Sequence, residues 1–158
     1  MSSTYLSFHI GNEIFALKTD KVLEVLQYQN QTITSVPNSP EFLKGILNFR
    51  GDGIPVFDTR VQFNIAEKSF NRKTFIIVVD LEFENETLRT GAIVDRVQNV
   101  LTINPEDISE VPPMKKHFNI EFIEGVVKHN NDFLLLLNME RVFSHDQSEY
   151  LKRIQNEE

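Results

Sequence analysis

A chain of 158 residues, of which 41% are hydrophobic and 25% charged, has the composition of a soluble globular domain and is long enough to bury a core. Its formal net charge of −7 at pH 7 opposes contact with a phosphate backbone, so no nucleic-acid partner is expected. The sequence contains no cysteine, which excludes disulfides, thiol catalysis and thiolate metal sites and is compatible with a cytoplasmic location.

Short apolar or alternating segments recur along the chain and are separated by Gly, Asn and Asp, a pattern typical of strands joined by tight turns. The predicted strands are Tyr5–Ile10, Ile14–Leu17, Ile46–Phe49, Ile54–Phe57, Thr74–Leu81, Leu88–Val94, Phe122–Lys128 and Phe133–Asn138. Hairpin turns are expected after Gly11, at Asp52-Gly53 and at Asn130–Asp132. We therefore predict a mainly β protein built from barrels.

Helix is scarce in this pattern. A helical turn is expected at Pro40–Leu43, with Ser39 as its N-cap, and a short C-terminal helix at Ser148–Gln155. The apolar stretches are all far shorter than the roughly 20 residues of a membrane-spanning helix. Direct membrane insertion is therefore not expected, and any membrane association should come through a partner.

The two halves of the chain resemble each other. Residues 42–47 match residues 122–127, and residues 20–26 match residues 95–101, at offsets between 75 and 80 residues. We infer two pseudo-equivalent barrel subdomains; the alternative is that strand-turn-strand segments look alike in any case. Because units of about 75 residues are barely stable alone, the two should share an interface, and a groove between them is a default binding site.

The glycine, histidine and serine residues fit no enzyme or metal-site motif. The glycines between residues 36 and 60 do not have the spacing of a nucleotide-binding loop, the four histidines have no zinc-site spacing, and no GxSxG sequence occurs. No cofactor, metal or catalytic residue is therefore expected. Arg50 is either a solvated hairpin arginine or the partner of a carboxylate such as Glu24, in which case it fixes the shape of a binding surface.

Two segments resemble the signatures of the CheW-like domain family. The first runs from Val36-Pro37 through Phe42–Gly51 to Ile54–Arg60, with Phe49 where the family usually has Leu, and the second is Gly91–Leu101. The resemblance covers residues 4–144 as a single domain and leaves residues 145–158 as a C-terminal helix or tail. It implies two intertwined SH3-like five-stranded β-barrel subdomains with a groove between them.

The resemblance also implies a function. CheW-like proteins are chemotaxis adaptors without catalysis, which couple the regulatory domain of a CheA-type histidine kinase to the cytoplasmic hairpin tips of methyl-accepting chemoreceptors and help to build receptor arrays at the membrane. One alternative is a coupling protein for a pathway that controls pili or gliding. Others are a small hydrolase with acidic residues in the groove and an oligosaccharide- or nucleic-acid-binding barrel.

Matching to the family implies two sets of binding residues. The receptor-facing groove and its support comprise Val22, Glu24, Gly45, Arg50, Val94 and Val100, for each of which plain core packing is the alternative. The kinase-binding set is Ile108, Val111 and Met114, in a segment whose Glu110 and Pro112–Met114 depart from the family pattern.

Overall fold

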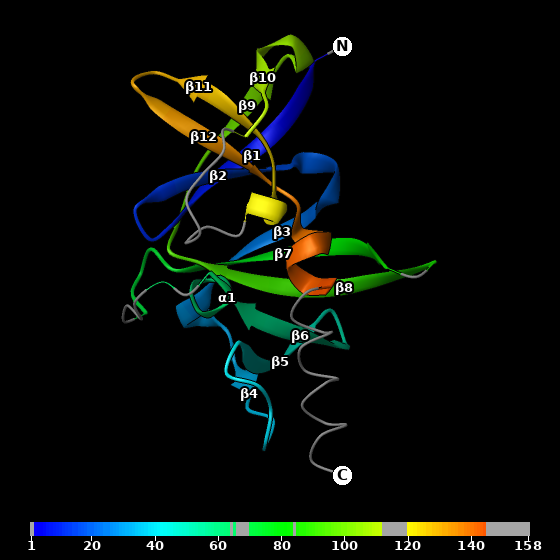
Figure 1. Ribbon diagram of the computed structural model, residues 1–158. Coiled ribbons are helices and arrows are strands. Elements are labelled where there is room, and N and C mark those ends of the chain that lie inside the picture. The colour runs from blue at the N-terminus through cyan, green and yellow to red at the C-terminus, as the bar shows by residue number, and fades with distance from the viewer. Residues whose placement is uncertain (1, 64, 66–69, 84, 112–119, 145–158) are drawn as a thin grey trace.

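The computed structural model describes residues 2–63, 65, 70–83, 85–111 and 120–144, and these form two packed β-sheets (Figure 1). Sheet A has the strand order β10-β11-β12-β2-β1-β9 and sheet B the order β3-β7-β8-β6-β5-β4. The strands of sheet A are β1 (Ser3–Ile10), β2 (Glu13–Lys18), β9 (Arg96–Ile103), β10 (Ile108–Ser109), β11 (Ile123–His129) and β12 (Asp132–Leu137). Those of sheet B are β3 (Val22–Gln27), β4 (Ile33–Thr34), β5 (Leu43–Phe49), β6 (Asp52–Asp58), β7 (Phe75–Phe83) and β8 (Glu86–Val94).

The two sheets have the same topology, which confirms the predicted pseudo-equivalent units. Each sheet contains one parallel pair, β2 with β12 in sheet A and β6 with β8 in sheet B. Each also has a register shift at the matching glycine, Gly45 in β5 and Gly125 in β11. Each sheet has six strands rather than five, because the two-residue strands β4 and β10 add to the edge. The SH3-like architecture is consistent with these two sheets.

The chain passes between the sheets twice, so the units are intertwined. It leaves β2, makes the 3-10 turn η1 (Thr19–Lys21) and enters β3; later it leaves β8, passes through Asp95 and enters β9. The described residues between 22 and 94 thus form unit B from one stretch of chain, whereas unit A is assembled from residues 3–18, 96–111 and 120–144.

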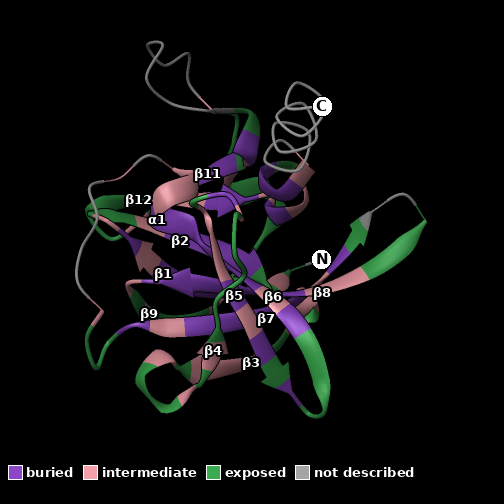
Figure 2. Ribbon diagram, turned by 90° about the horizontal axis from the view of Figure 1, so that it is seen from below, coloured by how far each residue is buried: buried purple, intermediate pink, exposed green. Residues whose placement is uncertain are grey.

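Buried residues lie on the strands of both sheets (Figure 2), and their side chains form three core clusters. One small cluster lies in unit B around Leu47, Val56 and Ile76, and another lies in unit A around Tyr5, Leu134 and Leu136. The largest cluster joins the units, with Phe8 and Phe15 of sheet A packed together with Ile77, Val79 and Val94 of sheet B. The expectation of a shared interface is therefore confirmed.

The helical predictions were partly wrong. Pro40–Leu43 forms one hydrogen-bonded turn, in which Leu43 N donates to the Pro40 carbonyl, and the Ser39 hydroxyl donates to the Val36 carbonyl instead of capping a helix. α-Helix occurs instead directly after β6, as α1 (Thr59–Gln62), and after β12, at residues 139–144.

The carboxylate of Asp58 accepts from Arg60 N, and the Asn138 side chain accepts from Arg141 N, so both helices are capped at matching positions. The predicted helix at Ser148–Gln155, like the whole segment 145–158, lies outside the described residues. None of the helices in the described part of the chain has the length and apolar character that a membrane crossing requires.

Candidate functional site

Arg50 and Glu24 form an ion pair on the surface of unit B. Arg50 lies in the turn between β5 and β6 with a φ of 53°, and its Nη2 donates to Glu24 Oε2 of β3 at 3.0 Å. The side chains are 63% and 40% exposed, so the pair is available to a partner. The Asn48 side chain accepts from Gly51 N at 3.0 Å and stabilises the turn. The predicted pairing of Arg50 with Glu24 is confirmed.

Three other predicted groove residues, Val22, Gly45 and Val94, also belong to sheet B. Val22 pairs with Val79 in the β3–β7 ladder and packs, half-buried, against the shared core. Val94 is fully buried in that core, so it can support the surface but cannot itself touch a partner. Gly45 has a φ of 153°, and a Cβ there would lie 2.3 Å from the Thr34 carbonyl oxygen. Gly45 therefore permits the close approach of β4 to β5.

Val100 lies on a different sheet from the other five. It belongs to β9, opposite Leu6 of β1, and is 62% exposed. Plain core packing is therefore wrong for this residue. Both β3 and β9 stand at the edge of their sheets, where unpaired backbone groups can accept a partner.

The sequence reasoning missed a buried arginine. Arg60 is 0% exposed and binds Asp58, with Nε donating to Oδ1 and Nη2 to Oδ2, both at 3.0 Å. Its Nη1 donates to Asp95 Oδ1 at 3.3 Å, and its Cζ lies 4.5 Å from the centre of the Phe70 ring. Burial alone lowers the pKa of Arg60, but hydrogen bonds and charge from Asp58 and Asp95 outweigh it and raise the pKa overall.

This cluster joins the two units and bears on the hydrolase alternative. Asp95 lies in the crossover from β8 to β9, and its Oδ2 accepts from Gly11 N in the β1–β2 turn at 2.6 Å. The two carboxylates that converge here are therefore neutralised by a guanidinium and do not face each other across an open groove. In the described residues, no three His, Asp or Glu side chains form a group suited to a metal ion.

A second ion pair lies at the other crossover, between β2 and β3. Lys21 Nζ lies 2.5 Å from Oε2 of Glu140, which also accepts from Glu82 N at 3.1 Å. Glu140 belongs to the helix of unit A. Lys21 immediately precedes β3, and Glu82 lies at the end of β7, so both belong to unit B. Glu140 follows Arg60 by 80 residues, which is the offset between the matching segments 42–47 and 122–127. The two residues therefore occupy equivalent positions in the two halves of the chain.

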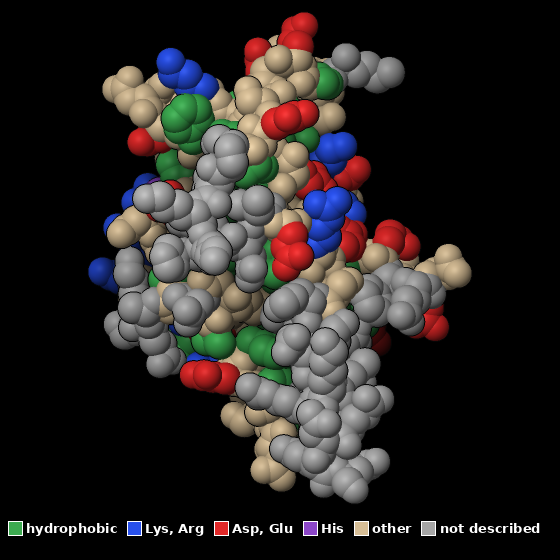
Figure 3. Space-filling model, viewed as in Figure 1, with side chains coloured by type: hydrophobic (Ala, Val, Ile, Leu, Met, Phe, Trp, Pro, Cys, Tyr) green, Lys and Arg blue, Asp and Glu red, His purple; other side chains and the backbone are tan. Residues whose placement is uncertain are grey.

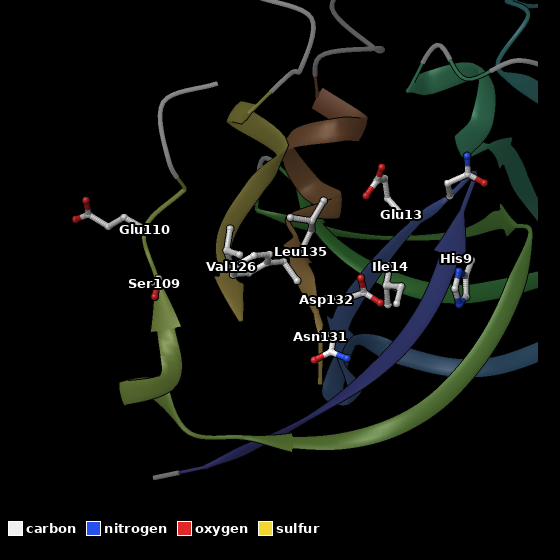
Figure 4. A pocket seen from close by; sticks show the side chains of 11 residues that line it. His9, Glu13, Ile14, Ser109, Glu110, Val126, Asn131, Asp132 and Leu135 are labelled. Atoms are coloured by element: carbon white, nitrogen blue, oxygen red, sulfur yellow. The ribbon is translucent and has the colours of Figure 1, made fainter. Parts of the chain in front are cut away.

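A surface hollow of about 630 Å³ opens on unit A beside the predicted kinase segment. Figure 4 shows Ser109 and Glu110 on one side, Asp132 and Ile14 on the other, and Val126 and Leu135 between them. The charged rim comprises Glu13, Glu110 and Asp132, and Phe133 lines the hollow while 62% exposed. Apolar side chains appear between charged ones over this upper sheet in Figure 3.

His9 also lines this hollow. Burial, and then the charge of Arg96, lower the pKa of His9 more than the Gln98 hydrogen bond and Asp95 raise it. Its Nε2 is buried without a hydrogen-bond partner among the described residues. A neutral imidazole therefore suits this position.

Ile108 and Val111 of the predicted kinase set flank Ser109 and Glu110 in the sequence, but neither of them lines the hollow. Ile108 pairs with Val127 and packs, half-buried, against the core of unit A, and Val111 is also half-buried. Met114 lies outside the described residues. A second hollow of about 270 Å³ is lined by Leu101, Lys128 and their neighbours, also in unit A. None of the six predicted receptor-facing residues lines either hollow, so the groove between the units stays a prediction.

Comparison with known proteins gives a consistent set of relatives. The family model described as CheW-like domain matches residues 4–147. Chemotaxis protein CheW of Klebsiella aerogenes is 31% identical over 143 residues, which cover 90% of this chain and 82% of that protein. Protein FrzA of Myxococcus xanthus is 26% identical, with 87% and 83% covered. The crystal structure of scaffolding protein TtCheW from Thermoanaerobacter tengcongensis matches with a TM-score of 0.79 and 30% identity, covering 90% of this chain and 93% of that chain.

Proposed function

This chain belongs to the CheW-like domain family and is a chemotaxis scaffold protein, and on that premise we propose that it couples a CheA-type histidine kinase to the cytoplasmic hairpin tips of chemoreceptors. The family acts through scaffolding, which is consistent with a chain that performs no catalysis. Its recruitment to receptor arrays at the membrane is part of the proposal and comes through these partners.

The observation that carries the proposal is the Glu24–Arg50 pair. An exposed arginine already paired with a carboxylate presents a planar guanidinium whose other donors make no hydrogen bond within the described part of the chain, so they can meet acceptors on a receptor helix. Arginine is also among the residues that contribute most when an interface buries them. We therefore assign the receptor-facing surface to Glu24 and Arg50, with Val22, Gly45 and Val94 as structural support within sheet B and Val100 as an exposed apolar contact on β9.

A coupling protein must hold two partners at once, so the kinase should bind elsewhere. The hollow beside β10 offers an apolar floor with an acidic rim and lies on unit A, whereas Glu24 and Arg50 lie on unit B. We assign the surface around Ile108 and Val111 to the regulatory domain of the kinase. The scaffold then transmits receptor movement because it holds kinase and receptor in a geometry that differs between two states.

The test is an NMR titration of the labelled protein with the kinase regulatory domain and, separately, with a receptor-tip fragment from the same organism. The receptor fragment should shift signals around Glu24 and Arg50, and the kinase domain should shift signals around Ile108 and Ser109. Arg50→Ala should weaken receptor binding by roughly tenfold, a loss of about 1.4 kcal/mol, and leave kinase binding unchanged.

The matched control is Arg72→Ala, which removes the same charge from another exposed position of unit B. It should retain the wild-type affinity for the receptor fragment. If both variants lost the same affinity for the receptor fragment, the effect of Arg50→Ala would come from net charge alone. A titration in which neither partner shifts any signal would refute the coupling function.

A further inference from the structure

Phe49 is a buried aromatic residue that lies directly beneath an exposed charge. It is the last residue of β5, is 4% exposed and belongs to the core cluster of unit B with Leu47 and Ile54. The Cζ atom of the neighbouring Arg50 lies 4.7 Å from the centre of the Phe49 ring. A guanidinium at this distance over a ring face is attracted by the ring quadrupole.

The backbone explains how adjacent residues come to stack. Successive side chains of a strand point to opposite faces, so a regular strand would direct Arg50 away from Phe49. Arg50 instead has a φ of 53°, in the left-handed region, which breaks the alternation at the end of β5. The guanidinium can then lie over the ring while its Nη2 binds Glu24.

A second arginine shares this ring. Arg89 of β8 has its Cζ 6.0 Å from the Phe49 ring centre, and its own charge is paired with Asp80, with Nε donating to Oδ1 at 2.9 Å. Because the Asp80 carboxylate balances the charge of Arg89, Arg89 does not repel the Arg50 guanidinium from the same ring. Arg50 thus has two independent restraints, a carboxylate on β3 and an aromatic face on β5.

We propose that Phe49 is a positioning residue that holds the Arg50 guanidinium in the orientation required by the receptor-facing surface. An exposed ion pair alone restrains a long side chain only weakly, because solvent screens the pair and the side chain keeps its rotamer freedom. The ring face removes part of that freedom before the partner arrives, and preorganisation of this kind raises affinity. The effect on affinity rests on the proposed function of Arg50; the orientation of Arg50 does not.

The first experiment measures that orientation without any partner. In wild-type protein, ring currents from Phe49 should displace the side-chain NMR signals of Arg50, and Phe49→Leu should move them towards the values of a free arginine. The matched control is Phe57→Leu, in which a buried ring that packs against Phe42 and Phe143 is removed from the next strand. Arg50 signals that stay unchanged in Phe49→Leu would overturn the proposal. Should Phe49→Leu fail to fold, Phe49→Met fills the same space without a ring.

The second experiment measures affinity for the receptor-tip fragment in a double-mutant cycle. Phe49→Leu should weaken binding by about 2- to 5-fold in the wild-type background and have no further effect once Arg50 is replaced by Ala. A merely structural role would weaken binding equally in both backgrounds and would overturn the proposal. If the wild-type protein itself does not bind the fragment, the proposed function fails, while the NMR comparison still decides whether Phe49 positions Arg50.

Discussion

Arg60 is the largest side chain that the described part of the fold buries completely. A buried charge is tolerated only where its hydrogen-bonding groups meet opposite charge in good geometry. Asp58 supplies a bidentate partner that is itself 1% exposed, and Asp95 supplies a second carboxylate from the crossover. The stacked Phe70 ring covers the guanidinium. The cluster therefore fixes α1 to the start of β9.

Replacing Arg60 by Leu should destabilise the protein by about 3–5 kcal/mol, because it leaves the Asp58 carboxylate buried without a counter-charge. Urea unfolding followed by circular dichroism measures the change. The matched control is Arg89→Leu, which breaks a half-exposed pair with Asp80 and should have a much smaller effect. Equal losses in the two variants would mean that burial does not set the energy of these pairs.

Sequence reasoning found one arginine and missed the other for a physical reason. Arg50 occupies a hairpin tip, and one of its two predicted roles, pairing with a carboxylate such as Glu24, is confirmed by the contact with Glu24. Arg60 follows Asp58 by two residues, and such local pairs usually lie on the surface. Its burial depends on Asp95, 35 residues away, and sequence spacing carries no information on that approach.

At the scale of elements, matching glycines let a short edge strand pack closely on each long hairpin. A Cβ at Gly45 would overlap the Thr34 carbonyl of β4, and a Cβ at Gly125 would lie 2.5 Å from Ile108 Cγ2 of β10. Both glycines coincide with the register shift of their hairpin. The glycine therefore determines where the sixth strand can pair.

Gly45→Ala should destabilise unit B by on the order of 1–3 kcal/mol from its backbone conformation, with a further cost from the clash with β4. Gly51→Ala is the matched control, because Gly51 also has a positive φ, of 90°, but the added Cβ has no heavy atom within 4 Å apart from those of Gly51 and its two chain neighbours. Thermal unfolding should show a larger loss for Gly45→Ala. The opposite order would exclude close packing of β4 as the reason for this glycine.

The predicted strands were found wherever apolar residues dominate, and two long strands were missed. β3 and β9 have mostly exposed or half-buried residues, so neither has the apolar face by which a strand is recognised. Both lie at sheet edges and are covered on fewer sides than the central strands. Their similarity to each other was visible in the sequence, but their strand character depends on pairing with β7 and β1.

At the scale of the whole molecule, 16 of the 30 buried hydrophobic residues in the described part of the chain belong to the one cluster that both units share. The internal match predicted two equivalent units with a shared interface. It did not predict that the chain exchanges sheets at Lys21 and at Asp95, because equivalent segments look the same whichever sheet they join. Each crossover residue forms an ion pair, and the sign of its charge differs between the two. Asp95 pairs with Arg60 at one crossover, and Lys21 pairs with Glu140 at the other.

We expect the two units to unfold together, because the loss of either exposes the shared core of the other. Urea unfolding followed residue by residue by NMR should give one midpoint for Ala16 and Leu134 of unit A and for Val56 and Ile76 of unit B. A fragment of residues 22–94, which contains all of sheet B, serves as the comparison and should lack dispersed NMR signals. Two separate midpoints, or a folded fragment, would contradict a shared core as the main source of stability.

The intertwined path also governs how the protein is made on the ribosome. Strands β1 and β2 emerge first, yet their neighbours in sheet A, β9 and β12, are synthesised only after the whole of unit B. Phe8 and Phe15 can meet Val79 and its neighbours on β7 and β8 early, but the shared core stays incomplete until translation has supplied Leu137 and the helix at residues 139–144. Long-range pairing of this kind is slow and leaves apolar surface open to association. Newly made chains should consequently depend on chaperones during translation more than a protein with two sequential domains of the same size.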